Sequence, residues 1–403
     1  MRLSSFLAMQ VKNPPAYRPT FSWIRRVLFI LLIGISLSLP PHRIQTRVCG
    51  PFQGGLTPSQ EAIGGSASGG ESLQEEPAST ISVPAPPELP ALLTLSPRAG
   101  FGLAEKADPL LWARRLGAGW YLDWAARSQP DLLAPEHWQM VRITPTCLLP
   151  NVQAIRQLAS RYPGLVWVIG NEPDVIWQDN LTPEVYAQHY HELYYLIKGL
   201  DPRASIATAG VSQATPLRLA YLDRVLAAYQ RMYGSPMPVD WWTVHGFILR
   251  EERNSWGVDI PPGFQENQGV LYEIADHARL DLFREHIIAF RQWMAENGYR
   301  QKPLALTEFG VLMPSEYGFP PELVADFLEQ TFNWLDTARD PQTGYPTDED
   351  HLVQRWAWFS LSDPLYLGSN LADLDQDILT QTGMRFREFV LGRLPSQPAL
   401  LEP

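Results

Sequence analysis

The sequence predicts an α/β fold, a (β/α)8 barrel that begins near residue 98 of the 403. Short continuous apolar runs alternate with stretches of helical period, and this rhythm repeats eight times. Over about 290 residues, these repeats fit a closed barrel of ~250 residues with insertions. The competing layout, an open doubly wound sheet, usually carries a glycine-rich phosphate loop after its first strand, and the sequence contains no such motif. The barrel is therefore the predicted fold.

The strands are expected where apolar residues run without alternation, because a parallel sheet ringed by helices is buried on both faces. These runs lie at residues 100–103, 119–124, 139–143, 165–169, 205–209, 241–244, 304–306 and 355–359. Each run is followed by a stretch in which apolar residues recur every three or four positions, so strands and helices are expected to alternate along the chain.

The helices are predicted from these apolar stripes and from residues that favour helix ends. One stripe consists of Leu280, Phe283, Ile287, Phe290 and Met294. Such a stripe is typical of a helix with one face on the core. Thr182 followed by Pro183 is typical of a helix start, with a capping residue before a proline in the first turn. Gly164 lies where a helix is expected to end and a strand to begin.

The first 97 residues are not expected to form part of the barrel. Arg25 and Arg26 precede an apolar run at residues 27–39, which is shorter than the ~20 residues of a membrane-spanning helix and is typical of a signal peptide. A buried core helix is the alternative, and cleavage or retention as an anchor stays open. We expect residues 1–40 to be a signal peptide or membrane anchor and residues 41–97 to be a Pro/Gly/Ser-rich linker. Residues 98–403 are expected to be one domain, located outside the cell or on its surface.

Composition narrows the kind of partner. The net charge of −11 argues against nucleic acid or an anionic membrane surface as a binding partner. The 14 Trp and 15 Tyr residues offer flat faces with a polar edge, which suit sugar rings as well as protein cores. Cys49 and Cys147 are too few for a disulfide scaffold and too far apart for a zinc cluster. We therefore expect a neutral ligand, no cofactor and a monomeric protein.

Two other groups resemble metal sites only superficially. His189 and His191 are two positions apart, so on a helix they do not share a face. The acidic run at residues 373–377 has Ile378 where a calcium loop of the EF-hand type needs glycine. We expect no metal site in either place.

Two glutamates follow apolar runs directly. Glu172 comes after the run at 165–169, and Glu308 comes after the run at 304–306. In a barrel both lie at the carboxyl ends of strands, where the active sites of such barrels are found. Hydrolysis of a glycosidic bond needs an acid for the leaving oxygen and a carboxylate for the anomeric carbon. Two such glutamates are compatible with glycoside hydrolysis, and pairing of each glutamate with an arginine at its strand end is the alternative.

Residues 170–174, Gly-Asn-Glu-Pro-Asp, and residues 307–310, Thr-Glu-Phe-Gly, resemble the two signature segments of clan A of the retaining glycoside hydrolases. The resemblance implies that Glu172 is the catalytic acid/base and Glu308 the catalytic nucleophile. It also implies that Asn171 contacts the 2-hydroxyl of the sugar.

Further segments are similar to one branch of that clan, the catalytic-core family that includes endo-β-1,3-glucanases. Residues 119–124, 239–245 and 354–359 resemble its second, sixth and eighth strands. The chain departs from the branch at residues 144–147, which lack an aromatic residue, and at Phe247, which lacks a hydroxyl. The resemblance implies a polysaccharide or oligosaccharide substrate, with β-1,3-glucan as the first expectation.

The remaining candidates for substrate binding are a histidine and several aromatic residues. His245 ends the sixth predicted strand and is expected to face the site. Trp358 is expected to floor the site, on the interpretation that Trp356 and Trp358 face opposite sides of their strand. The other candidates are Tyr121 and Trp124 on the second strand, and Trp256 in the long segment 246–276, which is predicted to be a lid or a binding wall.

Other functions remain open at this point. One is a hydrolase or transglycosylase for another β-glycan, such as mannan or galactan. Another is a catalytically silent carbohydrate-binding barrel at the cell surface. A nucleotide-dependent α/β enzyme is disfavoured, because the sequence has no phosphate loop.

Overall fold

The computed structural model describes residues 95–103, 107–130, 135–144 and 146–393. The predicted signal peptide or anchor at 1–40, nearly all of the linker at 41–97 and the end of the predicted domain at 394–403 lie outside the described residues. Strand β1 (Ser96–Gly102) begins before the predicted domain boundary at residue 98. Within the described ranges, no helix is both long enough and apolar enough to cross a bilayer.

A strand overlaps each of the eight predicted runs, with ends that differ by a few residues. The main strands are β1, β2 (Ala118–Leu122), β4 (Gln139–Ile143), β6 (Val166–Ile169), β7 (Ser205–Thr208), β8 (Trp242–His245), β9 (Leu304–Phe309) and β10 (Arg355–Trp358). Shorter strands are β3 (Glu136–His137), β5 (Leu148–Leu149), β11 (Ala372–Asp373) and β12 (Ile378–Leu379). The main strands pair in parallel, so the fold is α/β.

These strands form two larger sheets whose edges meet. One has the order β3-β2-β1-β10-β9-β8, and the other has the order β5-β4-β6-β7. β7 and β8 are linked by a parallel bridge between Ala207 and Trp241. Beyond β2, the backbone N–H of Trp138 donates to the carbonyl of Tyr121 at 3.0 Å. The main strands therefore follow one another in the order of the chain.

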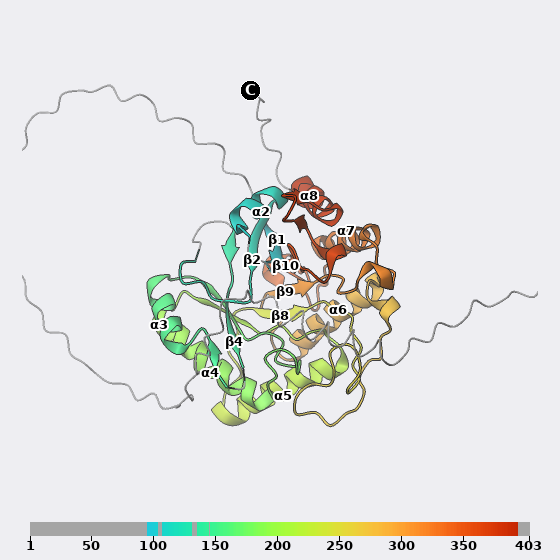
Figure 1. The fold of residues 1–403 in the computed structure, drawn as a ribbon. Helices are drawn as coiled ribbons and strands as arrows, with labels where there is room; N and C mark the ends of the chain where they lie inside the picture. The colour runs from blue at the N-terminus through green and yellow to red at the C-terminus, as the bar shows by residue number, and fades with distance from the viewer. Residues whose placement is uncertain (1–94, 104–106, 131–134, 145, 394–403) are drawn as a thin grey trace, which may run out of the picture.

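Helices lie outside the strands, as Figure 1 shows. They are α2 (Pro109–Leu116), α3 (Val152–Arg161), α4 (Pro183–Leu200), α5 (Pro216–Tyr233), α6 (Leu280–Glu296), α7 (Pro321–Thr337) and α8 (Gln381–Arg393). Short 3-10 helices are η1 (Ile274–Asp276), η2 (Ser315–Tyr317), η3 (Pro346–Asp348) and η4 (Leu367–Ser369). The predicted apolar stripe of residues 280–294 lies on α6, where most of its members are buried.

The local signals for helix ends act as expected, with one difference. α4 begins after Thr182 with Pro183 in its first turn, but the Thr182 side chain makes no capping hydrogen bond. At α5, the side chain of Thr215 accepts from the backbone N–H of Arg218. Gly164, between α3 and β6, has a φ of 88°, which glycine adopts at little cost.

Two apolar clusters explain why the strands are apolar throughout. The inner cluster takes all but one of its residues from β2, β4, β6, β7, β9 and β10 and none from a helix: Trp120, Leu122, Trp138, Met140, Val166, Val168, Ala207, Ala305 and Ala357. The outer cluster lies between strands and helices. On β2, Trp120 belongs to the inner cluster and Tyr121 to the outer one. Both faces of the strands are therefore buried.

Candidate active site

Three polar side chains meet at the carboxyl ends of strands. Glu172 follows β6, Glu308 is the penultimate residue of β9, and His245 is the last residue of β8. His245 pairs with Glu308 in the parallel register of β8 and β9. The residues Glu172, Glu308 and His245 are buried, with exposed fractions of 8%, 6% and 1%. The strand ends thus bring together both carboxyls predicted to be catalytic.

The imidazole of His245 joins the two carboxyls. Its Nδ1 lies 2.8 Å from Oε1 of Glu172, and its Nε2 lies 3.4 Å from Oε1 of Glu308. Because both nitrogens belong to one ring, the two carboxyls share a single site. Gly210 leaves room for this ring, since a Cβ at that position would lie 2.5 Å from Cδ2 of His245.

Burial and neighbouring charges shift the pKa values of Glu308 and His245. Burial raises the pKa of Glu308 to about 7. This value is the net result of several effects: the charge of Glu172 acts in the same direction as burial, whereas the charge of His245 and the hydrogen bond from Trp124 oppose the rise. Burial lowers the pKa of His245, but Glu308 and Glu172 outweigh burial and bring it above its ordinary value. The protonation of Glu308 and that of His245 therefore depend on the charges of their neighbours.

Aromatic side chains line one side of the site. The indole Nε1 of Trp124 donates to Oε1 of Glu308 at 2.6 Å, so this predicted residue does reach the site. Trp124 packs edge-on against Phe359, with ring centroids 5.5 Å apart. Phe359 in turn packs against Phe247 at 6.2 Å. Trp124 and Phe359 are half-buried, so both residues are partly accessible to solvent.

Asn171 lies beside Glu172 with its side chain almost wholly buried. Its backbone N–H donates to Oδ2 of Asp179 at 2.7 Å. The other carboxylate oxygen of Asp179 accepts from Nε of Arg142 at 2.6 Å. The Oδ1 of Asn171 is buried and has no hydrogen-bond partner among the described residues. A buried acceptor without a hydrogen-bond partner is suited to accept a hydrogen bond from a hydroxyl group of a ligand.

Two of the residues predicted to bind substrate lie elsewhere. Trp358 is fully buried on the helix side of β10, where its ring centroid is 5.3 Å from that of Phe309. Its Nε1 donates to the carbonyl of Ser369 at 2.7 Å. Tyr121 is fully buried on the helix side of β2 and stacks on His137 at 4.7 Å. The predictions that Trp358 and Tyr121 contact substrate are therefore wrong.

The error over Trp358 has a geometric cause. Residues two apart on a strand share a face, so Trp356 and Trp358 cannot face opposite sides. Both pack against Phe332 of α7. Ala357 between them belongs to the inner cluster. The aromatic residue that reaches the site is Phe359, just past the end of β10.

The long segment 246–276 forms a wall beside the site. Its residues Phe247, Leu249 and Val258 form an apolar cluster with Val175, and Phe359 packs against this cluster. Trp256 packs instead against the outer core cluster and is half-buried. Contact between Trp256 and substrate stays a prediction.

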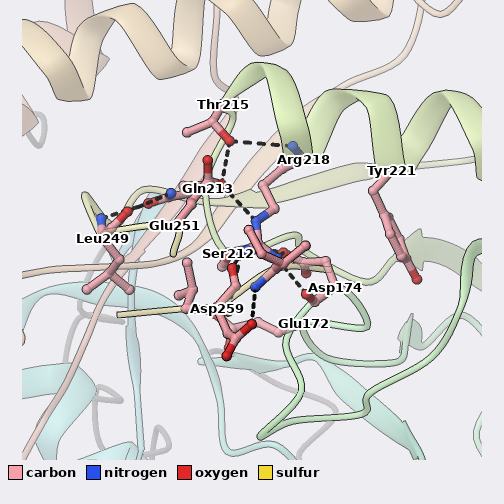
Figure 2. A network of polar contacts seen from close by, with 12 residues as sticks. Glu172, Asp174, Ser212, Gln213, Thr215, Arg218, Tyr221, Leu249, Glu251 and Asp259 are labelled. Atoms are coloured by element: carbon pink, nitrogen blue, oxygen red, sulfur yellow. Dashed lines mark hydrogen bonds and ion pairs between the residues drawn. The ribbon is translucent and has the colours of Figure 1, made fainter. Parts of the chain in front are cut away.

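A buried cluster of charges behind Glu172 was missed from the sequence. Arg218 of α5 lies 3.1 Å from Oδ2 of Asp174 and 2.9 Å from Oε1 of Glu251, and all three side chains are fully buried. Figure 2 shows this cluster with Ser212, whose hydroxyl donates to Asp174 at 2.9 Å. Burial raises the pKa of Asp174, and the positive charge of Arg218 opposes that rise.

The arrangement supplies the groups for acid, base and nucleophilic chemistry. The imidazole of His245 lies within 3.4 Å of both carboxyls in one buried site, and the indole N–H of Trp124 donates to Glu308. Among the described residues, no group of three or more His, Cys, Asp or Glu side chains is placed to hold a metal ion.

Solved structures with a similar fold include a GH128 (subgroup II) endo-β-1,3-glucanase from Pseudomonas viridiflava. Its TM-score is 0.50 at 17% identity, and the match covers 75% of this chain and 100% of that chain. A subgroup II endo-β-1,3-glucanase from Sorangium cellulosum gives 0.49 at 16% identity, covering 72% of this chain and 97% of that chain. A subgroup I endo-β-1,3-glucanase variant from Amycolatopsis mediterranei, in complex with laminarihexaose, gives 0.48 at 17% identity, covering 73% and 99%.

These likenesses concern the fold. No protein-family model matches the chain, and no curated protein matches it either. At 17% identity and a TM-score of 0.50, the Pseudomonas viridiflava structure is similar in fold over three quarters of this chain. The α/β fold predicted from the sequence is thus confirmed.

Proposed function

We propose that the protein hydrolyses O-glycosidic bonds in a β-linked glycan with retention of configuration, with Glu172 as acid/base and Glu308 as nucleophile. The observation that carries the proposal is the imidazole of His245 in contact with both carboxyls. Because this ring contacts two carboxyls at the ends of different strands, both carboxyls belong to one buried site. Double displacement needs two such groups.

The proposed reaction has two steps. Glu308 first attacks the anomeric carbon while Glu172 gives its proton to the leaving oxygen, so the glycosidic C–O bond breaks and a glycosyl ester of Glu308 forms. Glu172 then takes a proton from water, the water oxygen attacks the same carbon, and Glu308 leaves as a carboxylate. The unpaired Oδ1 of Asn171 is proposed to accept a hydrogen bond from the sugar 2-hydroxyl.

The electrostatics of Glu308 bear on this assignment. A nucleophile must be ionised, whereas burial raises the pKa of Glu308 to about 7 and so disfavours the ionised form. A raised pKa taken alone is a property of the acid. The assignment of roles therefore rests on the motifs around the two residues, and the hydrogen bond from Trp124 supports it by favouring the ionised form of Glu308.

β-1,3-Glucan is the substrate that we propose first. The resemblance of residues 119–124, 239–245 and 354–359 to the endo-β-1,3-glucanase branch supports this choice. The fold likeness to the Pseudomonas viridiflava endo-β-1,3-glucanase agrees with it. The half-buried rings of Trp124 and Phe359 offer apolar faces for the sugar.

We further propose that the main strands close into a (β/α)8 barrel, which the bridge between β7 and β8 supports. We also propose that residues 1–40 direct export, because they carry the charge and length of a signal peptide or anchor. A polysaccharide too large to enter a cell would then meet the enzyme outside it.

The test is product analysis on β-1,3-glucan, β-mannan, β-galactan and xylan, with NMR of the first anomer released. The proposal expects cleavage of β-1,3-glucan and the β-anomer as first product. Release of the α-anomer would contradict retention, and binding without cleavage of any glycan would favour a carbohydrate-binding barrel. A crystal structure should place the two carboxyls ~5–5.5 Å apart, and a separation well beyond ~6.5 Å would indicate inversion.

A further inference from the structure

The buried charges behind Glu172 hold three chain segments together. Arg218 belongs to α5, Asp174 to the segment after β6, and Glu251 to the segment 246–276. Their side chains are fully buried, so no solvent shares their charges. Loss of one partner would leave an uncompensated charge in the interior, which is strongly destabilising. The cluster therefore keeps its members in one arrangement.

On one side, Arg218 fixes the turn that carries Glu172. Its Nη1 donates to the backbone carbonyl of Asp174 at 2.5 Å and to Oδ2 of the same residue at 3.1 Å. Glu172 itself has a φ of 41°, in the left-handed region that residues other than glycine rarely adopt. Such a conformation persists only where its surroundings hold it. The backbone of Glu172 is held directly, since its N–H donates to the carbonyl of Gly210 at 3.1 Å and its carbonyl accepts from the N–H of Val175 at 3.0 Å. The contacts at Asp174, two residues on, add to that restraint.

On the other side, Arg218 fixes the wall of the site. Its Nη2 donates to the carbonyl of Asp259 at 2.5 Å, and its Nε donates to Glu251 at 2.9 Å. Glu251 also accepts from the hydroxyl of Thr215 at 2.6 Å and from the backbone N–H of Val270 at 2.9 Å. One guanidinium therefore ties the turn of Glu172 to the segment 246–276.

The residues between β7 and α5 reinforce this connection. Ser212 donates to Asp174 through its hydroxyl and through its backbone N–H. Gln213 exchanges two hydrogen bonds with the backbone of Leu249, at 2.7 and 2.9 Å. Figure 2 shows the side chains of this stretch pointing to both sides, toward Asp174 and toward Leu249 and Glu251. The connection between turn and wall is thus continuous.

We propose that Arg218 is a positioning residue for the acid/base Glu172, acting through Asp174, and that it couples the position of Glu172 to the wall 246–276. This inference rests on the proposed function. It differs from a purely structural role because proton donation depends on the exact placement of one carboxyl. A displacement of ~1 Å can lower a rate on the order of 10²-fold.

The test compares two substrates that differ in their need for an acid. A laminari-oligosaccharide has a poor leaving group and needs the proton of Glu172. The 2,4-dinitrophenolate of a 2,4-dinitrophenyl β-laminaribioside leaves without protonation. The variant is Arg218→Lys, which keeps the charge but has no planar fork to bridge Asp174, Glu251 and Asp259 together. Rates are expressed per active site, counted from the burst of dinitrophenolate.

For Arg218→Lys we expect kcat on the oligosaccharide to fall on the order of 10²-fold. The KM for the oligosaccharide and the burst rate on the activated substrate should change only a few-fold. Equal losses on the two substrates, per active site, would overturn the proposal, because they would indicate a general loss of structure.

Arg291→Lys is the matched control. Arg291 is also fully buried, but its hydrogen bonds go to the carbonyls of Arg300, Lys302 and Thr343 and to the sulfur of Met294. This variant should melt at a lower temperature without a change in the ratio of the two rates. The same change of ratio in Arg291→Lys and Arg218→Lys would also overturn the proposal.

Ser212→Ala keeps the proposal testable if Arg218→Lys does not fold. It removes one donor to Asp174 and leaves the charges paired. The ratio of the rate on the oligosaccharide to the rate on the activated substrate should fall, as in Arg218→Lys, but by a smaller factor. An unchanged ratio in Ser212→Ala overturns the inference. If the unaltered protein cleaves neither substrate, the proposed function itself fails. Activity of the unaltered protein with unchanged ratios in the variants defeats the positioning role alone.

Discussion

The two carboxyls of the candidate site are held in different ways. Glu308 lies within β9, which pairs with β8 on one side and with β10 on the other. Glu172 lies beyond the end of β6, in a turn, and its own φ is 41°. Regular strand pairing therefore fixes the first side chain, whereas hydrogen bonds and buried charges around Asp174 and Asp179 fix the second.

This difference indicates what fixes the position of a side chain at the carboxyl ends of the strands. A residue inside a strand inherits its position from two neighbouring strands and needs little further support. A residue on the following turn needs a framework of its own, and here that framework reaches α5 and the segment 246–276. Substitutions at the two glutamates and around them should therefore have separable effects.

The largest effect is expected from Glu308→Ala. Without the carboxylate no glycosyl ester forms, and hydrolysis should fall below the detection limit for oligosaccharides and activated glycosides alike. Added azide can occupy the vacated space and attack the anomeric carbon directly, which should give the α-glycosyl azide. NMR of the azide product checks this outcome, and a β-glycosyl azide from this variant would show that the two roles are exchanged.

Glu172→Ala should have the second largest effect. Loss of the acid should slow cleavage of an oligosaccharide by roughly 10²–10⁴-fold. An activated aryl glycoside should still form the glycosyl ester, so a burst of phenolate should precede a slow phase. Azide then bypasses the missing base and gives a β-glycosyl azide. Stopped-flow measurement of the burst, with Glu308→Ala as the control that lacks it, separates the two residues.

Sequence reasoning located the strand-end residues because their positions depend on local pattern. Continuous apolar runs predict the ends of β6, β8 and β9, and those ends carry Glu172, His245 and Glu308. The prediction failed at β10, where the aromatic residue of the site is Phe359 and not Trp358. Successive residues of a strand point to opposite faces. An error over the face of one residue therefore assigns a core residue to the site and a site residue to the core.

The charge cluster could not be predicted in the same way. Arg218 lies 44 residues from Asp174 and 33 from Glu251, so their meeting depends on tertiary structure. One signal was present, since Arg218 falls on the apolar stripe of α5 with Tyr221 and Val225. An arginine on a buried stripe requires a partner, because an unpaired buried charge is strongly unfavourable. The sequence did not reveal which carboxylates provide it.

A moderate effect on pH dependence is expected from Trp124→Phe. The indole N–H of Trp124 favours the ionised form of Glu308, so its loss should raise the pKa of Glu308 above about 7. A hydrogen bond to a charged group contributes about 1.5–3 kcal/mol, so a rise of about one unit is a conservative expectation. Because the nucleophile must be ionised, the acidic limb of kcat/KM should move to higher pH. The variant should therefore lose more activity at pH 6 than at pH 8, and an acidic limb that does not move would disconnect Trp124 from the ionisation of Glu308.

The smallest effect on activity is expected from a pair of substitutions at the end of β10. Phe359 is half-buried and packs against Trp124, whereas Trp358 is fully buried and faces α7. Phe359→Ala removes an apolar face from the site, so KM for an oligosaccharide should rise roughly 2- to 10-fold with little change in melting temperature.

Trp358→Phe leaves a gap in the core and removes the hydrogen bond to Ser369, so it should lower the free energy of unfolding by about 1–3 kcal/mol. Its KM should stay unchanged, because the lost atoms lie on the helix side of the strand. Urea unfolding and steady-state kinetics on both variants check the pair, and a raised KM in Trp358→Phe with an unchanged KM in Phe359→Ala would reverse the facing of these two residues.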